Sequence, residues 1–407
     1  HRPLDGTATP FDQKKAIDTI RVLSIDAIQQ ANSGHPGAPM GAAPMTYALW
    51  TSFLKHAPTR PDWIDRDRFV LSAGHASMLL YSMLHLTGYD LPLEEIKRFR
   101  QFGSKTPGHP EYGLTAGVDA TTGPLGQGFA NAVGMAIAER RLAAEFNQPG
   151  HEIIDHWTYT ICSDGDLQEG IAAEAASLAG HLKLGKLVAL YDDNDIQLDG
   201  PTSMAWSEDV LARFAAYGWH VQRVADGEDI AAIEAAIEAA RADERPSIIS
   251  VKTVIGAGSP NKAGTHKVHG APLGAEEVAA TKAALGFDPE ASFEVDAAVL
   301  EHFREAAETG EELVAEWEGR LTAYAEAFPE AGAELRRRID GVLAEGWDDD
   351  LPAYSTEDDG IATRNASANA IAGLAGGVPE LIGGSADLSG SNLTDIPDGG
   401  VFSADEG

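Results

Sequence analysis

The sequence predicts an α/β fold, a doubly wound parallel sheet with helices on both faces. The main reason is the stretch 157–200, which alternates an apolar strand pattern, an acidic glycine turn, an alanine-rich helix pattern and a second apolar strand. Such a strand–turn–helix–strand unit implies parallel strands whose following loops lie at one edge of the sheet. Strand and helix patterns also alternate before and after this stretch, which favours a large α/β domain.

Apolar residues that recur every three or four positions predict helices, and short apolar runs bounded by turn residues predict strands. Helices are expected at 11–32, from after His75 to Leu86, near 167–183, and at 129–146, 207–217 and 230–241. Strands are expected at 68–72, 157–162, 186–191, 220–224 and 247–255.

The chain is expected to contain two domains and a connector. Residues 1–275 form the α/β domain, and 276–350 form an acidic, mostly helical connector that ends in an Asp- and Pro-bearing segment. Residues 351–407 are interpreted as the truncated start of a second, similar domain, with a helix from Thr363 and a strand at 380–383.

Composition narrows the possible functions. The 30 basic and 63 acidic residues give a formal charge of −33, which disfavours nucleic acid and anionic membranes as partners. The single cysteine, Cys162, excludes an intramolecular disulfide framework and is interpreted as a buried structural thiol. No window approaches 18 consecutive apolar residues, so we expect a soluble, cytoplasmic protein without a membrane partner.

Two loops of the central stretch carry oxygen ligands at the carboxyl edge of the predicted sheet. One carboxylate (Asp164), one amide (Asn194) and the backbone carbonyl of Ile196 form a plausible half-shell for Mg²⁺, and a diphosphate would complete it. Gly165 would let the backbone approach that anion. The alternatives are a solvated acidic turn, or an EF-hand loop, which fits poorly because its twelfth position is Trp206.

Four histidines lie in turns that contain Gly or Pro, and all four turns are expected at the same edge of the sheet. They are His35, His75, His109 and His266. Neutral imidazoles can donate to hydroxyls or phosphate and move protons near neutral pH. A single histidine is more often a surface or core residue, and His85 and His181, in apolar helical runs, are interpreted as structural.

The segments around these residues resemble those of the thiamine-diphosphate-dependent transketolases, in the same order and along the whole chain. The matching segments are 32–37 (NSGHPG), 71–75 (LSAGH), 106–110 (TPGHP), 122–128 (TGPLGQG), 163–165 with 191–196, and 265–270 (THKVHG). The family usually has Gly where this chain has Ser163, and a side chain there requires a negative φ.

The resemblance implies a role for each matched residue. His75 and His266 would face the diphosphate and the substrate side of the cofactor, and His35 and His109 would bind the hydroxyls and carbonyl of a sugar. The residues implied to contact thiamine diphosphate directly are His75, Gly123, Leu125, Gly165, Asn194, His266 and Asp387, with Asp387 near the thiazolium. The cation, bound by Asp164, Asn194 and Ile196, would be Mg²⁺, Ca²⁺ or Mn²⁺.

In the second domain, Arg364 and Ser391 match the family's sugar-phosphate site, and an Arg can bind two phosphate oxygens at once. Glu169 and Glu174, which follow the cation loop, would lie at a subunit interface or on an ordinary solvated helix face. The resemblance further implies a homodimer with the active site at the interface.

The implied activity is that of a transketolase, the transfer of a two-carbon ketol unit from a ketose phosphate to an aldose phosphate, such as xylulose 5-phosphate and ribose 5-phosphate. Family members activate the cofactor with a glutamate in a Phe-Gly-(Val/Ile)-Arg-Glu-His segment, and no such segment occurs here. We therefore expect a fragment or part of a split enzyme, which alone binds cofactor weakly and turns over little.

Other functions remain open. Dihydroxyacetone synthase shares nearly every motif, and deoxyxylulose-phosphate synthase fits less well because the Arg364 and Ser391 segments match transketolase. A non-catalytic module that binds cofactor or metal would need none of the turn histidines. A dehydrogenase would need the dinucleotide fingerprint, which the glycine loop at 121–128 lacks.

Overall fold

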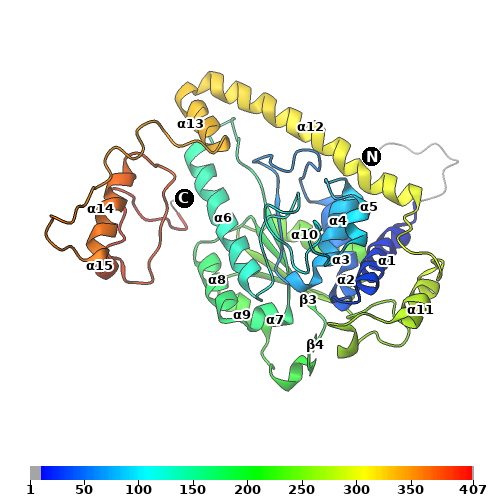
Figure 1. The fold of residues 1–407 in the computed structure, drawn as a ribbon. Coiled ribbons are helices and arrows are strands. Elements are labelled where there is room, and N and C mark those ends of the chain that lie inside the picture. Colours follow the sequence, from blue (N-terminus) through cyan, green and yellow to red (C-terminus); the bar gives the residue numbers. More distant parts are fainter. Residues whose placement is uncertain (1–10, 406–407) are drawn as a thin grey trace. The chain divides into compact units, whose positions relative to one another are not determined.

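The computed structural model describes residues 11–405 and shows two compact units (Figure 1). The first unit comprises the described residues up to Ala143 together with Ile154–Glu318, and the second comprises Ala144–Ile153 and the described residues from Gly319 onward. The expected boundaries at residues 275 and 350 stay predictions. Among residues 11–405, no helix combines the length and apolarity that crossing a membrane requires.

A five-stranded, all-parallel sheet forms the centre of the first unit, with strand order β1-β2-β3-β7-β6. The strands are β1 (Arg68–Leu71), β2 (Thr158–Ser163), β3 (Leu187–Asp193), β6 (His220–Val224) and β7 (Ser247–Lys252). The chain runs from β1 through β2 and β3 to β6 at the far edge and then returns to β7, which lies between β3 and β6. Each expected strand of the α/β domain is therefore confirmed, although β7 ends before the expected residue 255.

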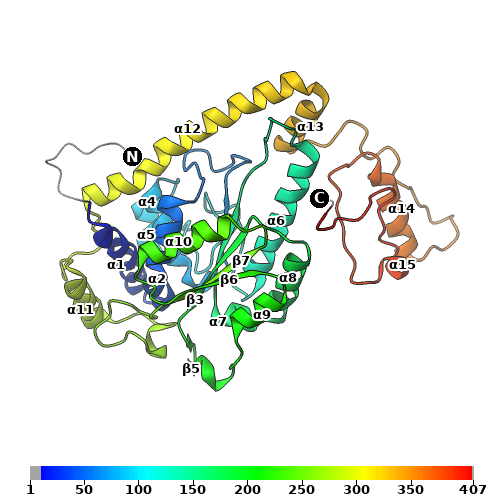
Figure 2. The same cartoon turned by 180° about the vertical axis from the view of Figure 1, so that it is seen from behind.

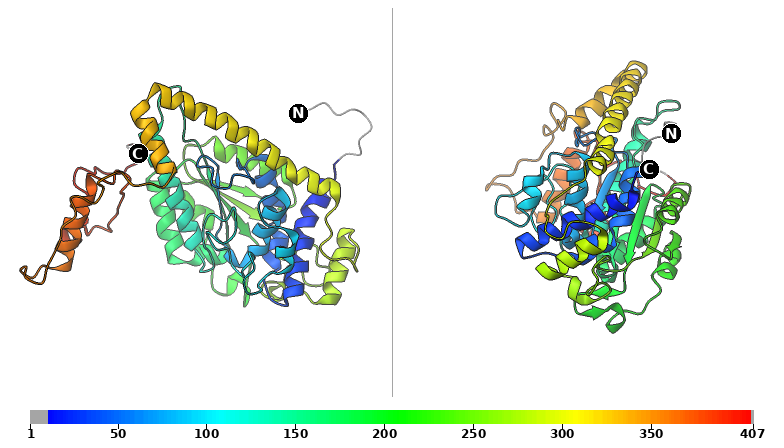
Figure 3. Two further views of the ribbon diagram at one scale, coloured as in Figure 1. Left: turned by 45° about the horizontal axis from the view of Figure 1, so that its top comes forward. Right: turned by 90° about the vertical axis from the view of Figure 1, so that its right-hand side faces the viewer.

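Helices cover both faces of this sheet, which confirms the predicted fold class (Figures 1 and 2, and from two further directions Figure 3). On one face, alternate strand residues such as Tyr159 and Leu190 join one apolar core with α1, α3, α4 and α10. On the other face, Phe129 of α6, Phe214 of α9 and Trp219 pack ring against ring. Strands buried on both faces explain the unbroken apolar runs in the sequence.

The helices expected in the α/β domain are present close to their predicted positions, whereas α2, α3 and α5 were not expected. The longer ones are α1 (Gln13–Ala31), α3 (Ala43–Ser52), α4 (Ser77–Thr87), α6 (Gln127–Phe146), α8 (Gly170–His181), α9 (Val210–Ala216), α10 (Ile230–Arg241), α11 (Ala275–Leu285) and α12 (Ala297–Ala327). The short ones are α2 (Gly37–Gly41), α5 (Leu93–Lys97) and α7 (Asp164–Gln168). A two-stranded antiparallel hairpin, β4 (Ile196–Gln197) and β5 (Gly200–Pro201), follows β3.

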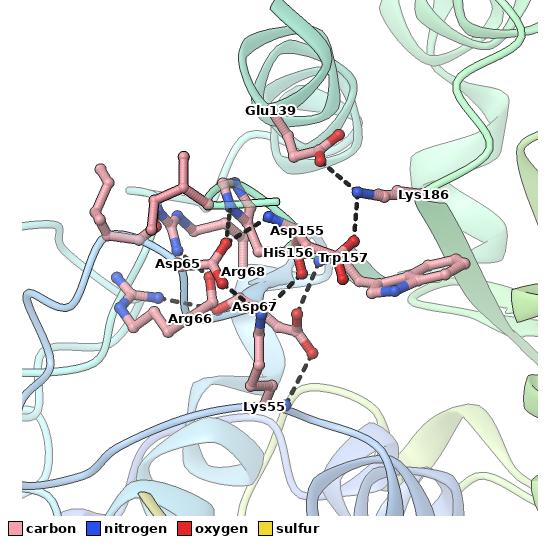
Figure 4. Close-up of polar contacts among 12 residues, drawn as sticks. Lys55, Asp65, Arg66, Asp67, Arg68, Glu139, Asp155, His156, Trp157 and Lys186 are labelled. Atoms are coloured by element: carbon pink, nitrogen blue, oxygen red, sulfur yellow. Dashed lines mark hydrogen bonds and ion pairs between the residues drawn. The ribbon is translucent and has the colours of Figure 1, made fainter. Parts of the chain in front are cut away.

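Buried carboxylates join the segments that enter β1 and β2 at the amino edge of the sheet (Figure 4). Asp67 accepts the backbone N–H groups of Lys55 at 2.8 Å and Trp157 at 2.7 Å. Asp65 accepts the N–H of Asp155 at 2.6 Å and the Lys55 ammonium at 2.8 Å. Burial raises the pKa of Asp67 to about 6. These bonds fix how the two strands start, and hence which residues lie side by side where they end.

The second unit contains α13 (Pro329–Ile339), α14 (Thr363–Ala375) and α15 (Ser389–Asn392). The helix expected from Thr363 is thus confirmed, but the strand expected at 380–383 is wrong. Glu380 instead forms two 3.0 Å contacts with the Arg337 guanidinium. A strand needs a neighbour to pair its backbone groups, and the described part of this unit contains no other strand.

Candidate functional site

A cavity of about 480 Å³ opens at the carboxyl edge of the parallel sheet. Residues that follow four different strands line it, namely His75 after β1, Asp164 after β2, Asn194 after β3, and Ile255 and His269 after β7. This is the edge at which open α/β sheets bind ligands. The structure therefore brings the two oxygen-bearing loops and part of the histidine set to one place.

Asp164 lies in an unfavourable electrostatic environment in the cavity. The Tyr191 hydroxyl donates to its Oδ1, while Oδ2 is buried with no hydrogen-bond partner. Burial raises the pKa of Asp164 to about 7, and the charges of Asp192, Asp193 and Asp195 raise it further against the Tyr191 bond. An unpaired carboxylate oxygen surrounded by negative charge is a suitable ligand for a cation. On this observation the residues fit a bound divalent cation.

Asn194 is held in one orientation beside it. Its Oδ1 accepts the Ile196 N–H at 2.9 Å, and its Nδ2 donates to Asp192 at 2.9 Å. Asp192 in turn accepts the Thr253 hydroxyl. No group of three or more His, Cys, Asp or Glu within residues 11–405 is arranged to hold a metal. A cation here would therefore depend on a mixed set of carboxylate, amide and carbonyl oxygens.

The loop that carries Asp164 differs from the expected free turn, because residues 164–168 form the short helix α7. Ser163 has φ −121°, an extended conformation that tolerates a side chain, and it forms a capping box with Asp166. The buried Asp166 also accepts the Gly126 N–H at 2.8 Å and the Ser72 hydroxyl at 2.7 Å. One carboxylate thus joins the loop that carries Asp164, the glycine loop and the end of β1.

The glycine loop packs closely against the end of β1 and the segment that carries Asp164. A Cβ at Gly74 would lie 2.7 Å from the Gly123 nitrogen, and one at Gly165 would lie 2.8 Å from Leu125 Cδ1. Gly123 has φ +154° and lies against the ring of His109. Gly123, Leu125 and Gly165 all line the cavity, where the sequence placed cofactor contacts.

Three imidazoles form a cluster in the wall of the cavity. The ring centroids of His35 and His75 are 5.1 Å apart, those of His75 and His269 are 5.2 Å apart, and those of His35 and His269 are 5.8 Å apart. Burial lowers the pKa of His75 to about 3 and that of His35 to about 4, and the charges of neighbouring histidines lower both further. The rings are therefore neutral at physiological pH.

His109 stands next to this cluster, since its ring packs on Gly123 and burial lowers its pKa. His266 does not join them: its side chain is exposed and it is not among the residues that line the cavity. His269, three residues later, lies in the wall instead. The sequence motif contained both imidazoles, and spacing alone could not distinguish them. No local signal in the sequence distinguishes them, because the burial of Val268 next to His269 is visible only in the structure.

Two of the expected sugar-phosphate residues lie together in the second unit. Arg364 Nη1 donates to the Ser391 carbonyl at 3.4 Å. Both side chains are exposed, as is Asp387, which has φ +58°. Glu169 lines the cavity of the first unit, and Glu174 is exposed on α8. The roles expected for these five residues stay predictions.

Comparison with known proteins agrees with this arrangement. A family described as "Transketolase, thiamine diphosphate binding domain" matches residues 12–344. The transketolase of Geobacillus stearothermophilus is 58% identical over 395 residues, which are 97% of this chain and 59% of that protein. Transketolase 1 of Escherichia coli is 54% identical over 387 residues, which are 94% of this chain and 58% of that protein.

Solved structures show the same fold. The transketolase of Leishmania mexicana superposes with a TM-score of 0.93 at 47% identity, over 97% of this chain and 59% of that one. The Pichia stipitis transketolase in complex with sedoheptulose 7-phosphate gives a TM-score of 0.91 at 50% identity, over 94% and 57% of the two chains. The chain thus spans somewhat under three-fifths of the length of its relatives, and it belongs to the transketolase family, whose thiamine-diphosphate-binding domain it carries.

Proposed function

We propose that the chain is the cofactor-binding part of a transketolase, with a divalent cation held by Asp164, Asn194 and the Ile196 carbonyl. The observation that carries this proposal is the buried, unpaired Oδ2 of Asp164. This residue lines the cavity together with Asn194, from the loop after β3. A cation would satisfy that oxygen and offset the surrounding carboxylates, and it would bind a diphosphate on its other side. Gly165 would give the diphosphate a backbone N–H.

Thiamine diphosphate, when bound, would supply a carbanion-stabilising ring that accepts the two-carbon unit. The chain's own residues would orient the sugar and move its protons. Neutral His35 and His109 would donate to hydroxyls and the carbonyl, while His75 would face the diphosphate. The geometry favours His269 over His266 as the fourth imidazole, because His269 lines the cavity and His266 does not.

The substrates would be a ketose phosphate and an aldose phosphate, such as xylulose 5-phosphate and ribose 5-phosphate. Support comes from Pichia stipitis transketolases, whose structures are described as complexes with xylulose 5-phosphate, sedoheptulose 7-phosphate and fructose 6-phosphate. Arg364 and Ser391 would hold the phosphate, with Asp387 near the thiazolium. A homodimer, in which the site lies between subunits, completes the proposal.

The test is a chimera in which this chain replaces the matching 395 residues of the Geobacillus stearothermophilus transketolase. It should transfer the ketol unit from xylulose 5-phosphate to ribose 5-phosphate only with thiamine diphosphate and Mg²⁺. The isolated chain should turn over little or nothing. A folded chimera without transfer would overturn the proposal in favour of a non-catalytic module, and preference for formaldehyde as acceptor would indicate a dihydroxyacetone synthase.

A further inference from the structure

We infer that Arg100 is a positioning residue, whose guanidinium fixes the neutral imidazole of His35 with its proton on Nε2, so that His35 acts as a donor to the cavity. The inference rests on the proposed function only for the identity of the ligand that receives this hydrogen bond. The sequence motifs did not single out Arg100, which lies between the two turns that carry His35 and His109.

Arg100 has an unusual backbone conformation. It has φ +61°, a left-handed conformation that is uncommon for residues other than Gly, Asn and Asp. Its N–H donates to the Thr106 carbonyl at 2.9 Å, which closes the loop between α5 and the turn that carries His109. The guanidinium lies 5.5 Å from the Phe99 ring centroid and is half-buried. A bulky side chain in a strained conformation is retained where its direction matters.

The guanidinium reaches the turn that carries His35. Nη1 donates to the Ser33 hydroxyl at 2.9 Å, and Nη2 lies 3.5 Å from His35 Nδ1. A guanidinium has only donors, so the ring nitrogen that faces it must be the unprotonated acceptor. The proton of neutral His35 then sits on Nε2. This assignment follows from chemistry, because the contact cannot form with the other tautomer.

The turn that carries His109 is shaped to admit the same guanidinium. A Cβ on Gly108 would lie 3.0 Å from Arg100 Nε and 3.1 Å from Cζ, so the absence of a side chain leaves the space that Arg100 fills. Burial is the main reason why the pKa values of His35 and His109 are lowered. For His35 the charges of His269 and then Arg100 add to this effect, and for His109 the charge of Arg100 adds to it. The Arg100 guanidinium thus contacts His35, fills the space beside Gly108, and helps burial to lower the pKa of both imidazoles.

The direct test is the ring nitrogen spectrum of the full chain labelled with ¹⁵N-histidine, recorded near neutral pH without cofactor or sugar. Loss of signals in His35→Asn identifies the ring of His35. The expected result is an unprotonated Nδ1 and a protonated Nε2. A proton on Nδ1 in the wild-type chain would overturn the inference, whatever the variants do.

Three variants separate the effect of the Arg100 charge from the effect of its hydrogen bonds to Ser33 and His35. Arg100→Met removes the charge and the hydrogen bonds, and it should give His35 a mixture of tautomers. Arg100→Lys keeps the charge, but a single ammonium cannot contact Ser33 and Nδ1 as the fork does, so the mixture should appear while the ring stays neutral. Gly108→Ala keeps Arg100 and displaces its guanidinium, with a smaller change in the same direction.

The matched control is Arg98→Met, since Arg98 is two residues away, half-exposed and paired with Glu95. It should leave the His35 signals as in the wild-type chain. Folding of each variant is checked by circular dichroism. Wild-type signals in folded Arg100→Met or Arg100→Lys would contradict the inference, as would equal changes in Arg98→Met.

Activity gives a second, separable measurement. In the chimera, Arg100→Met should lower kcat/KM for the ketose about 10–100-fold, because a misdirected donor costs about that much, while cation-dependent cofactor binding remains. If the chimera transfers no ketol unit but His35 shows the expected tautomer, the proposed function fails and the positioning role stands. The opposite outcome overturns the positioning role alone.

Discussion

The imidazole rings of His75 and His269 lie nearly parallel, with centroids 5.2 Å apart and 15° between their planes. They come from the loops after β1 and β7, which are far apart in the sequence. His75 is partly buried, and burial lowers its pKa to about 3. Stacking of this kind brings two neutral proton carriers to the wall of one cavity.

His269, and not His266, should therefore be needed for transfer. In the chimera, His269→Ala should lower kcat/KM for the ketose about 10²–10⁴-fold, the typical contribution of a general acid–base group. His266→Ala should leave it close to the wild-type value, since this exposed side chain does not line the cavity. Steady-state kinetics on both variants decide, and a larger loss in His266→Ala would contradict the account.

Gly74 should tolerate no side chain. Gly74→Ala would place a Cβ 2.6 Å from Thr122 Oγ1 and 2.7 Å from the Gly123 nitrogen, so the glycine loop must move. We expect a lower thermal midpoint and weaker cofactor binding. Gly134→Ala is the control, because it lies within α6 with no atom within 4 Å of the new Cβ, and it should stabilise the helix by about 0.5–1 kcal/mol. Equal midpoints for the two variants would show that the close approach is unimportant.

Asp166 should stabilise three segments together. In Asp166→Asn, the amide presents a donor where the carboxylate accepted the Ser163 and Gly126 N–H groups, so a loss of about 1–3 kcal/mol is expected. Asp209→Asn is the matched control, because Asp209 caps α9 through a single bond to Ala212 N–H and Asn caps equally well. Denaturant midpoints measure the stability of both variants. Indistinguishable midpoints would show that the hydrogen bonds of Asp166 do not stabilise these segments.

Acid should destabilise the first unit partly through His56. Its side chain is 5% exposed, and burial lowers its pKa to about 4. In the unfolded chain this histidine binds a proton below pH ~6.5, whereas in the folded chain it does so only below about pH 4. The free energy of unfolding is therefore unaffected by this group above pH 6.5 and decreases as the pH falls from 6.5 to 4. The slope from this group is at most about 1.4 kcal/mol per pH unit.

The variant His56→Phe keeps a ring beside Tyr89 and removes this titration. It should lower stability at pH 7, since the Tyr89 hydroxyl loses its 3.1 Å contact with His56. Between pH 6.5 and 4, however, the denaturant midpoint of this variant should fall less steeply than that of the wild-type chain. Parallel slopes for the two proteins would show that His56 does not couple folding to pH.

Much of the fold followed from the sequence because buried parallel strands and amphipathic helices leave strong local patterns. β6 (His220–Val224) and α10 (Ile230–Arg241) lie where periodicity placed them. The strand expected at 380–383 failed, because a strand depends on a partner that no local pattern reveals. The shared edge for Asp164 and Asn194 followed from parallel topology alone.

What the sequence could not supply was side-chain placement within loops. The turn that carries His266 and His269 follows β7, and only the packing of Val268 decides which imidazole faces the cavity. Arg100 was missed for a similar reason, since its contacts with Ser33 and His35 join segments 65 or more residues apart. Long-range contacts of this kind leave no periodic signal.

The most direct measurement is the calorimetric titration of the chimera with thiamine diphosphate, with Mg²⁺ and with a chelator. Asp164→Asn removes the unpaired carboxylate, and Asp195→Asn is the matched control, since the Asp195 side chain is 67% exposed and pairs with Lys252. The account predicts Mg²⁺-dependent binding in the wild-type and Asp195→Asn proteins and its loss in Asp164→Asn. Binding that is independent of the cation, or unchanged in Asp164→Asn, would contradict it.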